Sequence, residues 1–264
     1  MNVEFEPYKN KHTGERVFIV ANGPSLAETD LSLLEGEISI GMNRIALIYD
    51  KHPSWRPSYY LFSSTNVKHD DWGDAWTSSV REAASEERTT SFIASMFKPW
   101  IDPDEEQSRI KWFSSMSEKK PSSNGEIDPS CFSTDLVERI DKSGTTANLA
   151  LQLAYWMDFS EICFVGADLG WTKDEGSRND PNHFDESYRA NIPNPDKANK
   201  QMRNVHLLAL KHLEAKNVKI YNASKKTVLD SYPIIELEPY VRDRKVIRRE
   251  RDENQAKMFW QRFD

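Results

Sequence analysis

Cysteine and long apolar runs are scarce in this chain of 264 residues. Its two cysteines, Cys131 and Cys163, lie far apart and form neither CxxC nor another metal-type spacing, which argues against a disulfide framework and against a cysteine metal site. No apolar run approaches the roughly 20 residues that cross a bilayer. Residues 1–14 are too polar for a signal peptide. We therefore expect a reduced, cytoplasmic protein.

Excess positive charge is also missing. The chain has 42 acidic and 35 basic residues, and its formal net charge is −7. Because binding to phosphate backbones needs clustered positive charge, nucleic acid is not an expected partner. The glycine patterns GxGxxG and GxxxxGKS/T are absent too, which removes the usual signatures of NAD and ATP sites. This length predicts one large domain, with or without an inserted segment.

A strand-and-loop pattern stands near the start of the chain, RVFIVANGPSL at 16–26. The run 17–21 predicts a buried strand. The residues that break it are Asn22, Gly23, Pro24 and Ser25. Glycine lets the backbone approach an anion, proline presets φ for a helical turn, and serine offers a hydroxyl and an N–H. The leucines of 26–36 predict a helix of about three turns. This unit predicts an anion or nucleotide site, with an ordinary turn as the alternative.

Polar residues follow the next two predicted strands, at the ends where parallel sheets bind ligands. The strand predicted at 38–42 ends in Asn43, about 20 residues after Gly23, where a dinucleotide fold carries an acid. An amide both donates and accepts, which suits the edge of a base better than a pair of ribose hydroxyls. The strand predicted at 58–62 leads to a hydroxyl-rich end that includes Ser64.

A second loop-and-helix unit precedes an apolar helical face at 147–154. It starts with Ser143, Gly144 and Thr145. These residues offer hydroxyls and free N–H groups to an anion, while capping of the helix without a ligand is the alternative. The next run, 161–165, predicts a buried strand that ends at Gly166 and Asp168. A carboxylate there accepts from sugar hydroxyls, ligates a metal or caps a turn, and the sequence leaves these three roles open.

Residues 171–195 form the longest polar stretch without a helix pattern. A loop of this length inside a compact domain is usually functional or disordered, and we expect a mobile lid that orders over a ligand. Its aromatic and titratable candidates for contact with that ligand are Trp171, His183 and Tyr188. A helix at 197–216 and a last strand at 218–222 follow the lid.

The middle and the end of the chain carry weaker signals. Residues 68–88 and 99–129 are expected to form surface helices and loops around a short strand at 91–94. The tail 241–264 is dense in charge and closes with aromatic residues. Two interpretations of it are open: a helix that packs its aromatics on the body or on another subunit, and contact of its basic run with the inner membrane surface. We expect a Rossmann-like domain at 1–240, followed by this charged helical tail.

Three motifs occur in order along the chain: VANGPSL, GMNR and KSGTTANLALQLAYWMDFSEICFVGADLG. Together they resemble the bacterial sialyltransferase family that decorates lipooligosaccharides and capsules, and the related flagellin-glycosylating Maf proteins. The resemblance covers the first 45 residues and residues 140–224. It implies an α/β fold with a Rossmann-like, mostly parallel sheet flanked by helices and a mobile lid. It also implies a CMP-activated acidic nonulosonic sugar as donor and a glycan or glycoprotein as acceptor.

The same resemblance implies roles for individual residues. The implied nucleotide contacts are Asn22, Gly23, Ser25, Gly166 and Asp168, and the implied contacts near the donor sugar are Asn43, Ser143 and Gly144. His183 is the candidate general base, since histidine exchanges protons near neutral pH, although another lid residue stays open for this role. Tyr188 is the candidate that holds the departing phosphate. Helix starts at Ser25 and Thr145 are expected to stabilise that phosphate without a metal or another cofactor. We expect direct displacement at the anomeric carbon, and therefore inversion.

Two alternatives to a sialyltransferase-like glycosyltransferase remain. The archaeal 6-hydroxymethylpterin diphosphokinases, or MptE-like proteins, are similar in the GPSL loop, which implies a pyrophosphokinase that uses ATP and magnesium. That group carries aspartates after its second strand, where this chain has Gly41, Met42 and Asn43. The other alternative is a nucleotide-sugar-binding protein without catalytic activity.

Overall fold

A computed structural model describes most of the chain. The described residues are 1–63, 69–102, 104, 106–114, 116–117, 128–173, 180–188, 194–249 and 253–261. Ser64, predicted to belong to the site, lies outside them.

Seven parallel strands form the central sheet, in the order β5-β4-β3-β2-β1-β8-β9. Their bounds are β1 Arg16–Val20, β2 Ser39–Met42, β3 Tyr59–Phe62, β4 Thr90–Ala94, β5 Ile110–Phe113, β8 Glu161–Val165 and β9 Lys219–Asn222. The chain moves outward from β1 to β5 and then returns to place β8 on the other side of β1. The predicted α/β class, a Rossmann-like parallel sheet flanked by helices, is confirmed.

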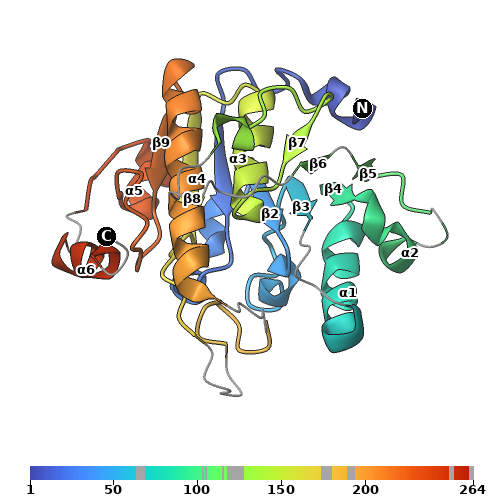
Figure 1. The fold of residues 1–264 in the computed structure, drawn as a ribbon, viewed down its shortest axis with the longest axis horizontal. Coiled ribbons are helices and arrows are strands. Elements are labelled where there is room, and N and C mark those ends of the chain that lie inside the picture. Colours follow the sequence, from blue (N-terminus) through green and yellow to red (C-terminus); the bar gives the residue numbers. More distant parts are fainter. Residues whose placement is uncertain are drawn as a thin grey trace.

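Helices cover this sheet and its edges (Figure 1). The α-helices are α1 His69–Ser85, α2 Lys98–Ile101, α3 Thr146–Trp156, α4 Pro195–Ala215, α5 Leu237–Asp243 and α6 Glu253–Trp260. Figure 1 shows α3 and α4 side by side in front of the strands, and α3 packs on β1, β2 and β3. The two-residue strands β6 Met116–Ser117 and β7 Ile140–Asp141 pair with each other apart from the main sheet. The short 3₁₀ turns are η1 Val3–Tyr8, η2 Pro24–Glu28, η3 Leu31–Leu34, η4 Ile45–Ile48, η5 Ser95–Phe97 and η6 Pro129–Cys131.

The central strands are buried on both faces, as their continuous apolar runs predict. Every residue of β1, β2 and β3 is buried. The register pairs Val20 with Gly41 of β2 and with Val165 of β8. The carboxyl ends of these three strands therefore align, and the loops that follow them begin at one edge of the sheet. In a doubly wound sheet this edge, where the strand order reverses, is the usual ligand site.

The prediction of one helix at 26–36 is wrong. The structure has two short 3₁₀ turns there, η2 and η3. The chain leaves helical geometry at Thr29, whose φ and ψ are −97° and 129°. Asp30 then accepts a hydrogen bond from the Ser32 N–H at 3.0 Å and starts the second turn. Threonine and aspartate side chains compete with helical backbone bonding in this way, and the leucine spacing does not reveal it.

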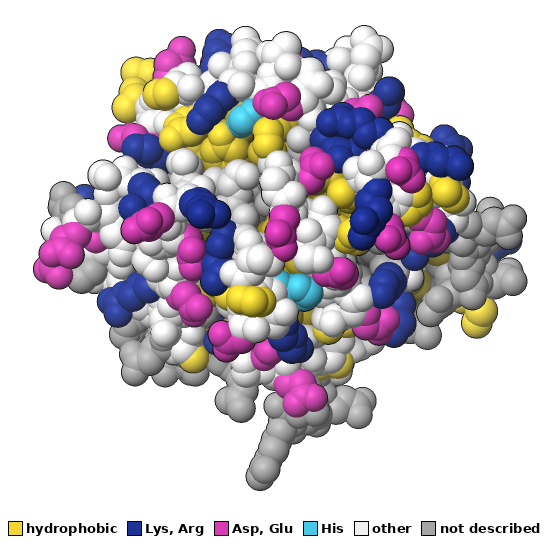
Figure 2. Space-filling model, turned by 180° about the vertical axis from the view of Figure 1, so that it is seen from behind, with side chains coloured by type: hydrophobic (Ala, Val, Ile, Leu, Met, Phe, Trp, Pro, Cys, Tyr) yellow, Lys and Arg dark blue, Asp and Glu magenta, His cyan; other side chains and the backbone are white. Residues whose placement is uncertain are grey.

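The middle of the chain contains a helix, as expected for 68–88, and a strand that was not expected. Residues 69–85 form one helix, α1, in which Trp76 and Val80 are buried. Residues 110–113, expected to lie in a loop, form the edge strand β5. Within the described residues, no helix is both long enough and apolar enough to cross a membrane. On the face shown in Figure 2, acidic and basic side chains are intermixed.

Candidate functional site

The loop after β1 is joined to the end of β8. The Gly23 N–H donates to the Gly166 carbonyl at 2.8 Å. A Cβ atom on Gly23 would lie 2.6 Å from Oδ2 of Asp168 and 2.7 Å from that same carbonyl oxygen. Close packing therefore requires glycine at position 23. Its φ does not, because a φ of −69° is open to any residue. The two predicted nucleotide-binding stretches meet here.

Asp168 caps the loop that was predicted to hold a phosphate. Its Oδ2 accepts from the Ser25 N–H at 2.6 Å, and its Oδ1 accepts from the Ser25 hydroxyl at 2.5 Å. Of the three roles that the sequence left open, capping is the one seen in the structure. Burial raises the pKa of the Asp168 carboxyl to about 6, against the opposing effect of the two Ser25 hydrogen bonds.

The predicted helix start at Ser25 is wrong as well. Ser25 belongs to η2, a turn of five residues that begins with Pro24. A turn this short has no α-helical macrodipole to offer an anion. Any attraction of an anion to this loop therefore depends on individual N–H and hydroxyl groups.

Asn22 has an unsatisfied amide oxygen. Its Nδ2 donates to the Met42 carbonyl at 3.2 Å, which ties β1 to the end of β2. Its Oδ1 is buried and has no hydrogen-bond partner within the described part of the chain. Asn22 is 7% exposed, so bulk water does not readily satisfy this oxygen. A buried acceptor without a partner is uncommon, and it suits a ligand that donates an N–H or O–H.

Asn43, at the end of the strand predicted at 38–42, lies at the same edge of the sheet. Its φ of 54° lies in the left-handed region, which asparagine tolerates better than most residues. Its Oδ1 accepts from the Thr146 hydroxyl, at 3.2 Å, at the first residue of α3. The start of α3 thus lies beside the ends of β1 and β2.

The polar groups and the glycine before α3 make hydrogen bonds and packing contacts within the protein. Thr145 caps the helix by accepting from the Ala147 N–H at 3.3 Å. The buried Ser143 donates its N–H to Oδ1 of Asp141 at 2.9 Å. Gly144 has a φ of 79°, and a Cβ there would lie 2.9 Å from Cγ2 of Val205 on α4. The predicted capping alternative describes Thr145 in this structure.

Residues 180–188 of the predicted lid pack onto this edge of the sheet. The Phe184 N–H donates to the main-chain carbonyl of Asn22 at 3.1 Å. Next to it, Nδ1 of His183 lies 2.9 Å from Oδ2 of Asp180. With the proton on Nδ1, the carboxylate orients the ring and leaves Nε2 as an acceptor. Nε2 makes no hydrogen bond to any described residue.

Tyr188 stacks on His183. The ring centroids are 3.8 Å apart, and the planes differ by 5°. Burial raises the pKa of the Tyr188 phenol, although hydrogen bonds involving Arg44 and the Asn43 side chain lower it. The phenol is therefore neutral at physiological pH.

Buried Arg44 fastens this segment to the body. Its Nη1 donates to the carbonyls of Ser187 at 2.6 Å and Tyr188 at 2.8 Å. Its Nη2 and Nε donate to the Ala75 carbonyl and the Ser79 hydroxyl of α1. The Arg44 guanidinium therefore joins the lid segment to α1, directly beside Asn43 in the chain.

Trp171 is held in place by α4. Its N–H donates to Oδ1 of Asn199, and its carbonyl accepts from Nδ2 of Asn199, both at 2.8 Å. Its ring centroid lies 5.5 Å from that of His183. The Trp171 ring thus lies beside the His183 imidazole, and its backbone is held by Asn199, which is fully buried.

Comparison with known proteins gave similarity at the level of fold. No protein-family model and no curated protein sequence matches the chain. Among solved structures, it is similar to the sialyltransferase CST-II in complex with a trisaccharide acceptor and CMP, with 16% identity, coverage of 90% of this chain and 92% of that chain, and a TM-score of 0.44. It is also similar to the monofunctional α-2,3-sialyltransferase Cst-I from Campylobacter jejuni, with 14% identity, coverage of 93% and 94%, and a TM-score of 0.47. At these values no residue role follows from the likeness.

The structure gathers most predicted site residues at one edge of the sheet. The residues joined there by direct contacts are Asn22, Gly23, Ser25, Asn43, Gly166, Asp168, Trp171, His183 and Tyr188. Sequence reasoning missed Asp180, Arg44 and Asn199, which position them. Among the described residues there is no group of three or more His, Cys, Asp or Glu side chains arranged to hold a metal ion.

Proposed function

We propose that the chain is a sialyltransferase-like glycosyltransferase that moves an acidic nonulosonic sugar from a CMP-activated donor to a glycan or glycoprotein acceptor. The observation that carries this proposal is the His183 imidazole, oriented by Asp180 and stacked on Tyr188, at the strand end where Asn22 lies. The three motifs that resemble bacterial sialyltransferases fall on these same strand ends. The proposal includes inversion at the anomeric carbon and needs no metal.

In this proposal His183 is the general base. Its Nε2 takes the proton of the acceptor hydroxyl while that oxygen attacks the anomeric carbon. As the C–O bond to CMP breaks, positive charge develops on the sugar and negative charge on the phosphate. Tyr188, a neutral phenol in this environment, donates a hydrogen bond toward the departing phosphate.

Asn22 and Asp168 are the proposed nucleotide contacts. The unpartnered Oδ1 of Asn22 suits an N–H or O–H of the nucleoside, such as a ribose hydroxyl or the cytosine amine. A phosphate that binds to the Ser25 N–H and hydroxyl must displace the Asp168 carboxylate or meet it protonated. A pKa of about 6 makes protonation of Asp168 inexpensive near neutral pH.

Nucleotide binding tests this proposal before any acceptor is known. Calorimetric titrations of the purified chain with CMP, UMP, AMP and ATP, each with and without Mg²⁺, are expected to show the tightest binding for CMP and no effect of Mg²⁺. Release of CMP from a CMP-activated acidic sugar then tests catalysis. Binding that requires ATP and Mg²⁺ would instead support the pyrophosphokinase, and CMP binding without turnover of any donor would support a binding protein.

Substitution of His183 separates binding from catalysis. We expect His183→Gln to lower turnover of the CMP-sugar by roughly 10²–10⁴-fold, the usual contribution of a positioned acid or base, with CMP affinity within about twofold of the parent. His52→Gln, a histidine outside this edge, is the matched control and is expected to keep full turnover. Unchanged turnover in His183→Gln would remove His183 as the base.

A further inference from the structure

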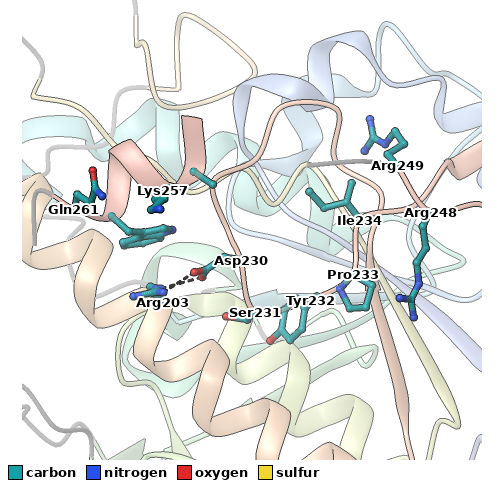
Figure 3. A pocket seen from close by; sticks show the side chains of 12 residues that line it. Arg203, Asp230, Ser231, Tyr232, Pro233, Ile234, Arg248, Arg249, Lys257 and Gln261 are labelled. Carbon is teal, nitrogen blue, oxygen red and sulfur yellow. Dashed lines mark hydrogen bonds and ion pairs between the residues drawn. The ribbon is translucent and has the colours of Figure 1, made fainter. Parts of the chain in front are cut away.

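A cavity of about 740 Å³ opens between α4, α6 and the chain that follows β9 (Figure 3). None of the residues predicted to form the site lines it. The lining residues that matter here are Arg203 of α4, Lys257 and Trp260 of α6, Ser231 and Ile234 after β9, and Arg248. The cavity is nevertheless close to the candidate site along α4, because Arg203 follows the Asn199 that holds Trp171 by about one helical turn, roughly 6 Å.

The α6 wall of the cavity is firmly attached. The Arg203 guanidinium binds Asp230 through two hydrogen bonds, of 2.9 and 2.5 Å. It also lies against the Trp260 ring, whose centroid is 4.5 Å away. The indole N–H of Trp260 donates to the Val228 carbonyl at 2.7 Å. These contacts join α4, α6 and the segment after β9 along one wall of the cavity.

The cavity has more positive than negative charge. Its lining contains three arginines and one lysine but only one carboxylate, that of Asp230, which is paired with Arg203. Arg248 and Lys257 are exposed and make no ion pair with any described residue. Figure 3 shows Lys257 on the α6 side and Arg248 on the opposite side, with Ser231 and Pro233 between them. Two cations that make no ion pair with a described residue therefore lie on different sides of the cavity.

A free hydroxyl group lies between these cations. Ser231 is 8% exposed, and its Oγ has no hydrogen-bond partner within the described part of the chain. A buried hydroxyl without a partner is uncommon and points to an acceptor supplied from outside. Ile234 and Pro233, next to it, offer apolar surface for a carbon skeleton.

We propose that this cavity binds a small molecule carrying two oxyanionic groups, phosphate or carboxylate, at a site separate from the nucleotide site. Arg248 and Lys257 each pair with one anionic group, and the Ser231 hydroxyl donates to an anionic oxygen between them. Charge-assisted bonds of this kind are stronger than neutral ones. The proposal goes beyond the proposed glycosyl transfer and does not depend on it.

Calorimetric titration of the full chain tests this site. The probes are fructose 1,6-bisphosphate for two phosphates and glucarate for two carboxylates, each at low salt with and without saturating CMP. We expect saturable binding of at least one probe, weakened by salt as for any screened charge, and unaffected by CMP. The arm with the higher affinity identifies the anionic group. No saturable binding of either probe would overturn the proposal.

Variants assign the binding to the cavity. We expect Arg248→Gln with Lys257→Gln to weaken binding of the better probe at least roughly tenfold, since both charge-assisted bonds are lost. Ser231→Ala is expected to weaken it by roughly tenfold through loss of one bond to a charged group. The matched control, Lys51→Gln with Lys211→Gln, removes the same charge outside the cavity and is expected to leave affinity within twofold. Equal weakening in the control would reduce the effect to net charge and overturn the site.

A CMP titration of the same variants keeps this test separate from the proposed function. The double variant at the cavity is expected to bind CMP as the parent does. Loss of probe binding with CMP binding intact supports the second site. Loss of both ligands in a variant that stays folded by circular dichroism would mean that the cavity and the nucleotide site are not separate.

Discussion

Burial changes the protonation chemistry of Asp168. Both of its carboxylate oxygens accept hydrogen bonds from Ser25, which stabilises the charged form, yet burial outweighs this and raises the pKa from 3.8 to about 6. The group is thus poised between a carboxylate that closes the loop and a neutral acid that tolerates a nearby phosphate. A loop of this kind can exchange an internal anion for a ligand anion.

The raised pKa predicts how stability depends on pH. Between about pH 3.8 and 6 the folded protein holds the Asp168 proton more tightly than the unfolded chain does, so stability falls as pH rises through this window. The full effect is on the order of 3 kcal/mol, from about 1.4 kcal/mol per pH unit. Asp168→Asn is expected to remove this part of the slope, measured as urea unfolding free energies at pH 4, 5, 6 and 7.5.

Asp30→Asn is the control for that experiment. A hydrogen bond from the Ser32 hydroxyl, helped by the Ser32 N–H, lowers the pKa of Asp30. Its contribution to stability is therefore present above the ordinary aspartate value and is lost only as pH falls below it. The slope between pH 4 and 6 should survive in Asp30→Asn. The same slope in Asp168→Asn as in the parent would contradict a raised pKa at Asp168.

The sequence predicts which residues gather at the site better than it predicts what they bond to. Strand ends are visible in the sequence, so Asn22, Asn43 and Asp168 were placed at one edge. The bond between Ser25 and Asp168 joins residues 143 positions apart, and only the strand order brings them together. Asp180 lies three positions before His183, but nothing in a polar stretch distinguishes an orienting carboxylate from a solvated one.

At the scale of elements, the lid segment is positioned by one side chain. Arg44 joins the carbonyls of Ser187 and Tyr188 to α1, and its guanidinium carbon lies 5.4 Å from the Trp76 ring centroid and 5.9 Å from that of Tyr188. Carbonyls that lose such a donor remain buried without a partner. This makes Arg44 a positioning residue for His183 and Tyr188.

Removal of Arg44 is expected to release the lid segment. In Arg44→Met we expect faster hydrogen exchange at the Phe184 and Tyr188 amides, and a loss of stability on the order of 3 kcal/mol from the lost charge-assisted bonds. Exchange is measured by mass spectrometry on the folded protein. Arg56→Met removes an arginine that lies over the Tyr49 ring and pairs with Glu86. This control should leave exchange in 180–188 unchanged, and equal protection in Arg44→Met and the parent would refute the fastening role.

Elements with strong periodicity were predicted well from sequence, and elements governed by side-chain competition were not. β8 was predicted with the bounds that it has, because its apolar residues form an unbroken run. The helix at 26–36 failed because Thr29 and Asp30 form local hydrogen bonds that end one turn and start another. β5 was missed because half of it is partly exposed at the sheet edge, so its pattern is that of a loop.

At the scale of the whole molecule, the reversal of strand order between β1 and β8 decides where chemistry can occur. The alternation of strands and helices predicts a parallel sheet, but the sequence does not reveal that β8 returns beside β1. That return brings the loops after β1 and β8 together and leaves β9, α5 and α6 at the edge opposite β5 (Figure 1). The candidate site and the cavity are linked along α4, where Asn199 holds Trp171 and Arg203 lines the cavity.

The same arrangement bears on the predicted boundary at residue 240. Charge density rises at 241, yet α5 spans 237–243, and buried Tyr240 bonds Glu161 of β8 through its hydroxyl. Arg16 of β1 donates to the carbonyls of Tyr240 and Val241, at 2.8 and 3.1 Å. By these contacts α5 belongs to the core, whereas α6 attaches mainly through Trp260 and its neighbours.

Two truncations distinguish these attachments. A chain ending at 249 loses α6 and the buried Trp260, and we expect it to fold with a loss of about 3–5 kcal/mol, the usual cost of removing a large buried aromatic side chain. A chain ending at 236 also loses α5 and leaves the buried guanidinium of Arg16 with fewer acceptors, so it is expected to unfold below 37 °C. Thermal unfolding followed by circular dichroism measures both. A chain ending at 236 that is as stable as one ending at 249 would mean that α5 is an appendage, because the contacts of Arg16 and Tyr240 would then contribute nothing to the stability of the sheet.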